Sequence, residues 1–110
     1  FLVSDQLEEV GVRPQGLLLE PLARNTGPAI AVAALWLLRR DPDALMLVQP
    51  SDHVIASLPE FHAAVMRGTA AAREGRLVTF GVRPDRPDTG YGYIQGGAAI
   101  RGIEGVLDVE

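Results

Sequence analysis

The chain has 110 residues, of which 47% are hydrophobic and 22% are charged, and it carries a formal net charge of −4 and no cysteine. This composition is typical of a folded globular domain or a piece of one, and it excludes disordered, collagen-like and disulfide-framed classes as well as thiolate metal sites. The acidic balance argues against polymeric nucleic acid as a partner; no apolar run is long enough to span a membrane and no basic segment opens a signal peptide, so we expect a cytoplasmic location.

The hydrophobic pattern predicts three helices. Residues 1–10 have apolar side chains at close to helical spacing, and Gly11 stands where a C-terminal glycine would end the helix. The second helix follows three candidate capping residues, 25–27, and it is apolar on nearly every face, so we expect neighbouring elements to cover it on several sides. The third helix runs over residues 59–73 and ends near Gly75.

Short apolar runs between and after the helices predict strands. They lie at residues 16–19, 44–48 and 77–82, with further short strands expected at 91–95 and 105–110. Strands that alternate with helices form right-handed βαβ units. We therefore expect an α/β fold with an open, mostly parallel sheet and helices on both of its faces.

The polar triplet Ser51, Asp52 and His53 follows directly after the apolar run 44–48. Open parallel α/β sheets bind ligands beyond the carboxyl ends of their strands, where helix N-termini and loop amides converge. A carboxylate at that edge could hold Mg²⁺, which takes one or two protein carboxylates and completes its octahedron with phosphate oxygens and water. Asp52 is therefore a candidate metal ligand.

Other roles are open for the same three residues. Asp52 could cap the turn that follows, Ser51 could close a turn, and a packed structural role is the better expectation for His53. An esterase built on Ser51 and His53 is disfavoured, because adjacent residues rarely reach nucleophile-to-base geometry and no GxSxG turn surrounds the serine.

Three stretches, taken in their order and spacing, resemble the sugar-nucleotide pyrophosphorylases and in particular the bacterial mannose-1-phosphate guanylyltransferases. The stretches are LLLEPLARNTGPAIAVAAL at 17–35, VQPSDHVI at 48–55 and FGVRPDRPDTGYGYI at 80–94. The resemblance covers nearly the whole chain except residues 95–105. It implies a nucleotidyltransferase fold with a Rossmann-like sheet, and it implies that Asp52 is catalytic as the ligand of Mg²⁺.

The resemblance also implies binding residues for the nucleotide. Arg24, Asn25 and Thr26 are similar to the segment that cradles the guanine nucleotide, at a helix N-terminus that favours anionic groups. It places Glu20 and Ser51 among the nucleotide-binding candidates as well. On residue type alone, Asn25 and Thr26 could instead cap the helix, Arg24 could be a surface arginine, and Glu20 could simply end a strand.

The TGYGY stretch resembles the loop that lines the sugar side of the site. Gly90 and Gly92 would let the backbone approach a hydroxylated ring closely. Tyr91 and Tyr93 could each pack against the sugar or against the protein core, and the sequence leaves both alternatives open.

Two motifs of the family are missing, the glycine-rich N-terminal signature GGxGxRLWPLSR and the later EKP motif. All ten basic residues are arginines, so the chain by itself also lacks the lysine that phosphate sites often use. We therefore expect residues 1–110 to be the central part of a longer nucleotidyltransferase domain. A further isomerase domain and homo-oligomer formation are left open.

For the intact protein the resemblance implies a bacterial enzyme that transfers a guanylyl group from GTP to mannose 1-phosphate, giving GDP-mannose and pyrophosphate. The chain alone is expected to be inactive. The alternatives are a nucleotide- or sugar-binding module without catalysis, and a pyrophosphorylase for another sugar phosphate and nucleotide, because one scaffold serves several substrates.

Overall fold

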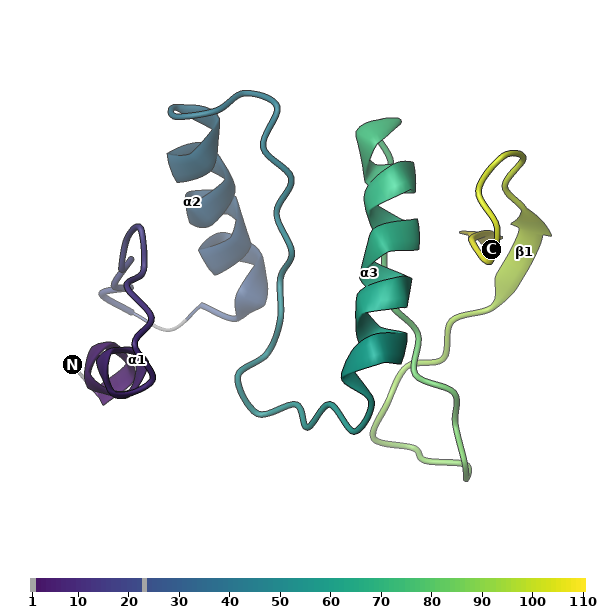
Figure 1. Ribbon diagram of the computed structural model, residues 1–110. Helices are drawn as coiled ribbons and strands as arrows, with labels where there is room; N and C mark the ends of the chain where they lie inside the picture. Colours follow the sequence, from purple (N-terminus) through teal and green to yellow (C-terminus); the bar gives the residue numbers. More distant parts are fainter. Residues whose placement is uncertain (1, 23) are drawn as a thin grey trace. The chain divides into compact units, whose positions relative to one another are not determined.

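The computed structural model describes residues 2–22 and 24–110. In chain order they form α1 (Leu2–Glu9), α2 (Thr26–Leu38), α3 (Leu58–Arg73), β1 (Gly96–Ala99) and β2 (Leu107–Val109), as Figure 1 shows. The chain divides into two units, Phe1–Val48 and Gln49–Glu110, and each is described by itself. In the described residues, no helix combines the length and apolar character needed to cross a membrane.

Helices α1 and α3 both end at a glycine in the left-handed region, where φ is 72° for Gly11 and 82° for Gly75. The Gly11 N–H donates to the Glu8 carbonyl at 2.9 Å, and the Val12 N–H donates to the Leu7 carbonyl at 2.8 Å. The same pair of hydrogen bonds closes α3. This is the Schellman arrangement, which glycine adopts without strain. Both predicted helix ends are confirmed, while the predicted helical start at residue 1 lies outside the described residues.

Helix α2 forms where the sequence predicts it, and residues near its C-terminal end make specific contacts. At the C-terminal end the Arg40 guanidinium donates to the Trp36 carbonyl at 3.0 Å and lies 3.6 Å from the centroid of the indole ring. This cation complements the negative end of the helix dipole. A Cβ placed on Gly16 would lie 2.6 Å from Trp36 Cζ2. The chain before α2 can approach the Trp36 ring this closely because residue 16 has no side chain.

The expectation that neighbouring elements cover α2 on several sides is wrong for the described residues. The helix buries none of its residues, and its aliphatic side chains remain between 36% and 61% exposed at Ile30, Val32, Leu35 and Leu38. The physical reason is that the described residues of the same unit, 2–22 and 24–48, form no strand, whereas the helices of α/β proteins are normally buried against a sheet.

The described part of the chain has one hydrogen-bonded sheet, an antiparallel ribbon of β1 and β2. The runs 16–19, 44–48 and 77–82, predicted as parallel strands, form no strand ladder there. The combination of helices with a small sheet is consistent with the α/β class, but the predicted parallel pairing is not present among these residues. Such pairing joins segments that are distant in sequence, so an apolar run does not by itself specify its partner.

The ribbon corrects the position of one predicted strand. The strand expected at residues 91–95 is wrong, because β1 lies just after it at Gly96–Ala99. A Cβ on Gly96 would lie 2.8 Å from Leu107 Cδ1, so this glycine marks a close approach between strands and not a loop. The strand predicted at residues 105–110 is confirmed as β2.

A small core forms around α3. Gly68 and Ala71 are buried on this helix, and a Cβ on Gly68 would lie 2.7 Å from Phe80 Cζ. The chain that follows α3 therefore packs back against it at a position without a side chain. Among the described residues the buried hydrophobic side chains are Ala71 and Ile103, so α3 and the turn between β1 and β2 hold what core there is.

Candidate functional site

A hollow at the N-terminus of α2 brings together four of the five predicted nucleotide-binding residues. It has a volume of about 490 Å³. Its lining residues are Glu20, Arg24, Asn25, Thr26 and Ala29. Glu20 precedes the others by several residues, and in the same segment Gly16 approaches Trp36 of α2 closely. The fifth predicted residue, Ser51, belongs to the unit Gln49–Glu110.

Asn25 has an unusual backbone conformation, with φ 63° and ψ −174°. Residues other than glycine occupy this region at a cost of about 1–3 kcal/mol. In residues 2–22 and 24–110 it is the one non-glycine residue with a positive φ. Asn25 holds the N-cap position of α2, yet its side chain makes no capping hydrogen bond. The structure therefore does not support helix capping as the role of this side chain. Among the described residues, the side-chain amide of Asn25 has no hydrogen-bond partner, and it lies at the edge of the hollow.

The hollow combines free backbone donors with charged side chains. The Asn25 side chain does not cap α2, and Pro28 has no N–H, so among the described residues the amides of Thr26 and Gly27 have no partner at the positive end of the helix dipole. Neither of the two ion pairs among the described residues includes Arg24, and a guanidinium offers five N–H donors to a ligand. Glu20 adds a hydrogen-bond acceptor. The arrangement suits a ligand that carries both an anionic group and polar N–H or O–H groups.

Asp52 lies with Ser51 in an exposed turn. Its carboxylate makes no ion pair within the described ranges, and the N-cap residue of α3 is Ser57, so Asp52 does not cap that helix. No group of three or more metal-binding side chains forms among the described residues. A lone, unpaired carboxylate nevertheless fits Mg²⁺, because this ion takes few protein ligands and fills its octahedron with phosphate oxygens and water.

The neighbours of Asp52 give one confirmation and one correction. Ser51 is part of the turn, in line with the turn-closing alternative, and its role toward the nucleotide stays a prediction. The packed role expected for His53 is wrong, because this residue is exposed; the chain between the turn and α3 has no element against which the imidazole could pack. In the part of the chain that the structure describes, Ser51 and His53 share no hydrogen bond, so the esterase alternative finds no support in the geometry.

The predicted sugar-side loop is held by hydrogen bonds between an aspartate and a tyrosine. The Tyr93 hydroxyl lies 2.6 Å from the Asp88 nitrogen and 3.1 Å from the Asp88 carbonyl oxygen, and the Gly90 N–H donates to Asp88 Oδ1 at 2.8 Å. Tyr91 is 76% exposed, and a Cβ on Gly92 would meet open space. Asp88 was not among the residues predicted to shape this loop, although an aspartate two residues before a glycine is a known turn signal.

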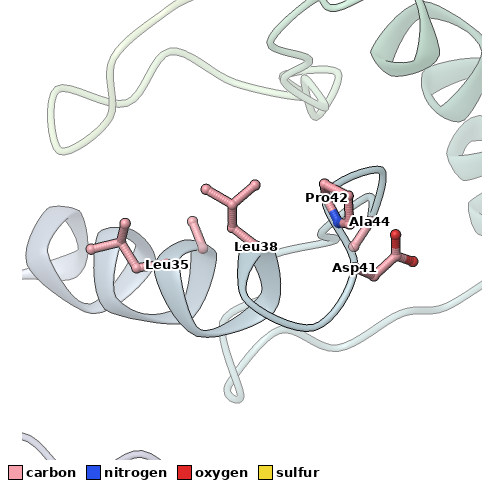
Figure 2. Close-up of a pocket in the computed structure, with 6 residues that line it drawn as sticks. Leu35, Leu38, Asp41, Pro42 and Ala44 are labelled. Carbon is pink, nitrogen blue, oxygen red and sulfur yellow. The ribbon is translucent and has the colours of Figure 1, made fainter.

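A second hollow lies at the other end of α2, with a volume of about 230 Å³. Figure 2 shows Leu35 and Leu38 extending from the same side of the helix, with Pro42 and Ala44 on the chain that follows. Its acidic residue, Asp41, already accepts the Asp43 N–H at 3.0 Å. The lining is otherwise apolar, so this hollow has the character of an uncovered packing surface.

The comparisons place the chain in a family. A family model described as nucleotidyl transferase matches residues 2–105, and the chain therefore belongs to the nucleotidyl transferase family. A hollow with unpaired donors, a strained asparagine and an unpaired arginine beside a helix N-terminus agrees with that class, because nucleotides present phosphates and polar ring edges. No solved structure matches the chain significantly.

Among curated relatives, the chain is 56% identical over 98 residues to xanthan biosynthesis protein XanB of Xanthomonas campestris, which covers 89% of the chain and 21% of that protein. It is 50% identical over 100 residues to a mannose-1-phosphate guanylyltransferase of Escherichia coli, covering 91% and 21%. Alginate biosynthesis protein AlgA of Pseudomonas aeruginosa is 44% identical over 110 residues, covering 100% and 23%. The chain thus spans about a fifth of the length of the curated relatives it matches.

Proposed function

We propose that the protein containing this chain transfers a guanylyl group from GTP to mannose 1-phosphate, which gives GDP-mannose and pyrophosphate. The observation that carries the proposal is the 50% identity, over 91% of the chain, to a relative named mannose-1-phosphate guanylyltransferase. The hollow that Glu20, Arg24, Asn25 and Thr26 line together supports the proposal, because these residues offer the donors, the acceptor and the positive charge that a guanine nucleotide needs.

The proposal extends to the fold of the whole domain. In it, the runs 16–19, 44–48 and 77–82 are strands of an open, mostly parallel, Rossmann-like sheet. The exposed aliphatic side chains of α2 support this arrangement, because an all-apolar helix is stable in water only when other elements cover it. A cytoplasmic location is part of the same proposal.

The residues at the N-terminus of α2 have distinct tasks with the nucleotide. The Arg24 guanidinium donates to phosphate oxygens, with the free amides of Thr26 and Gly27 adding backbone donors on the same side. The Asn25 side-chain amide both donates and accepts, so it suits the edge of a guanine base. Glu20 accepts from an N–H or O–H group of the nucleoside. Ser51, which belongs to the other unit, is also proposed to bind the nucleotide through its hydroxyl.

Asp52 is the residue that would hold Mg²⁺ in this proposal. Its carboxylate is exposed and free of ion pairs among the described residues, which leaves its oxygens available to a hard cation. When bound, such an ion neutralises part of the charge of the phosphates and helps to align them. The role of Asp52 is therefore to fix where that neutralisation occurs.

The chemistry requires no covalent enzyme intermediate. A phosphate oxygen of mannose 1-phosphate forms a bond to the α-phosphorus of GTP, and the bond from that phosphorus to the oxygen bridging to the β-phosphate breaks. Pyrophosphate leaves with the electron pair. The attacking oxygen is already deprotonated near neutral pH, so the protein contributes alignment and charge stabilisation and not a base.

The loop that contains Gly90, Tyr91, Gly92 and Tyr93 is assigned to the sugar in this proposal. Its exposed tyrosine ring and its glycine backbone suit a hydroxylated ring, which offers C–H faces for stacking and hydroxyls for hydrogen bonds. In this proposal the loop binds the sugar and the hollow binds the nucleotide.

Pyrophosphate release by the full-length protein tests the proposal. GTP, ATP and UTP are each combined with mannose 1-phosphate and with glucose 1-phosphate, in the presence of Mg²⁺. We expect the fastest release with GTP and mannose 1-phosphate. Faster release with another pair would identify a pyrophosphorylase of different specificity, and calorimetric binding of GTP without any release would identify a binding module.

A further inference from the structure

The two tyrosines of the sugar-side loop differ in their hydrogen bonds. The Tyr93 hydroxyl accepts from the Asp88 N–H and donates to the Asp88 carbonyl, at 2.6 Å and 3.1 Å. A phenol has one proton to donate, so that proton is already committed within the loop. The Tyr91 hydroxyl forms no hydrogen bond in the described part of the chain, and its side chain is 76% exposed.

The two glycines differ in the same way. The Gly90 N–H donates to Asp88 Oδ1 at 2.8 Å, so this amide serves the loop itself. The Gly92 N–H has no acceptor among the described residues, and the space around its α-carbon is open. Over residues 90–93 an engaged amide and an engaged ring, those of Gly90 and Tyr93, therefore flank a free ring and a free amide, those of Tyr91 and Gly92.

We infer that Tyr93 and Asp88 are positioning residues that hold the loop 88–93 in the conformation that binds the sugar phosphate, and that Tyr91 and the Gly92 amide make the contacts. This inference rests on the proposed function for the identity of the ligand. The three hydrogen bonds through Asp88 close a ring of six residues, which reduces the conformational freedom that the loop would otherwise lose on binding.

The substitution Tyr93→Phe keeps the ring and removes both hydroxyl hydrogen bonds. In the full-length protein we expect the KM for mannose 1-phosphate to rise about three- to tenfold, since a net hydrogen bond corresponds to roughly that factor. The KM for GTP and kcat should stay within about twofold, because other residues line the hollow at α2 and contact the reacting phosphates. A general loss of folding would instead lower the amount of active enzyme and would not change one KM alone.

The side chain of Asp88 provides a second test with a built-in rescue. Asp88→Ala removes the acceptor of the Gly90 N–H and should raise the same KM, while Asp88→Asn keeps a carbonyl oxygen at that place and should restore most of the affinity. In the double variant Tyr93→Phe with Asp88→Ala, the KM for mannose 1-phosphate should rise by less than the product of the two single effects, because both changes act on one loop conformation.

Hydrogen exchange gives a readout that needs no enzymatic activity. Tyr93→Phe should accelerate amide exchange in residues 88–93, and Tyr91→Phe should leave it unchanged, because the Tyr91 hydroxyl holds nothing in place. Unchanged exchange in Tyr93→Phe, or a change in kcat or in the KM for GTP instead of the sugar-phosphate KM, would overturn the inference. Absence of pyrophosphate release in the unsubstituted protein would refute the proposed function, and the exchange result would still decide whether Tyr93 holds the loop.

Discussion

Replacing Asn25 by glycine should stabilise the protein while weakening its binding of GTP. The backbone of Asn25 lies at φ 63° and ψ −174°, a region that costs a non-glycine residue about 1–3 kcal/mol. Glycine removes that cost but increases the freedom of the unfolded chain, which opposes it by about 0.4–1 kcal/mol. The difference predicts a gain of roughly 1 kcal/mol in the free energy of unfolding for Asn25→Gly.

Asn25→Ala is the matched control. Alanine lacks the side-chain amide, as glycine does, but it has a Cβ and tolerates this backbone less well than asparagine. We expect Asn25→Ala to lower the free energy of unfolding by about 1 kcal/mol, so the two variants should differ by roughly 2 kcal/mol. Both should raise the KM for GTP by a similar factor of about five to ten, because both lose the same hydrogen-bonding amide.

Urea unfolding and initial-rate kinetics of the full-length protein measure the two effects separately. If the Asn25 side chain were a helix cap, its loss would destabilise even the glycine variant by a few tenths of a kcal/mol. A destabilised Asn25→Gly variant would therefore refute the strain argument. An unchanged KM for GTP in both variants would refute the assignment of the amide to the nucleotide.

Three further changes test other parts of the site and the core. Asp52→Ala should reduce pyrophosphate release by at least about 100-fold and change the free energy of unfolding by less than about 0.5 kcal/mol, since the side chain is exposed and unpaired; near-normal turnover would exclude Asp52 as the Mg²⁺ ligand. Arg24→Lys keeps the charge but loses the forked donors, so the KM for GTP should rise about tenfold, while Arg101→Ala, at an exposed turn, should leave it unchanged. Gly68→Ala places a Cβ 2.7 Å from Phe80 Cζ, and the clash should outweigh the gain in helix propensity by about 1 kcal/mol in thermal unfolding; a more stable variant would show that this contact does not form.

The helices could be predicted because their signals are local. The hydrogen bonds of α1 and α3 join residues a few positions apart, and each helix ends at a glycine that adopts a positive φ. Gly11 and Gly75 therefore marked the correct ends without knowledge of the rest of the chain. The predicted nucleotide-binding residues 24–26 also share a hollow partly because they are adjacent in sequence.

The strands could not be predicted in the same way. An apolar run such as 44–48 shows that a segment prefers burial, but the partner with which it pairs lies elsewhere in the chain. The described sheet uses β1, for which the sequence predicted no strand. Its glycine at position 96 is accommodated because Leu107 on β2 occupies the space that a side chain there would fill. Such a contact between distant residues leaves little trace in the local sequence around either residue.

Local pattern by itself determined the helices, their glycine ends and the acidic turn at Asp52, and the resemblance of three stretches indicated the family. Only the tertiary structure decided that Glu20 joins residues 24–26, that Asn25 is strained and uncapped, and that Tyr93 is tied to Asp88 while Tyr91 is free. The physical reason is that local hydrogen bonds and turn preferences depend on neighbouring residues. Close approaches and the pairing of individual donors with acceptors depend on how the chain packs against itself.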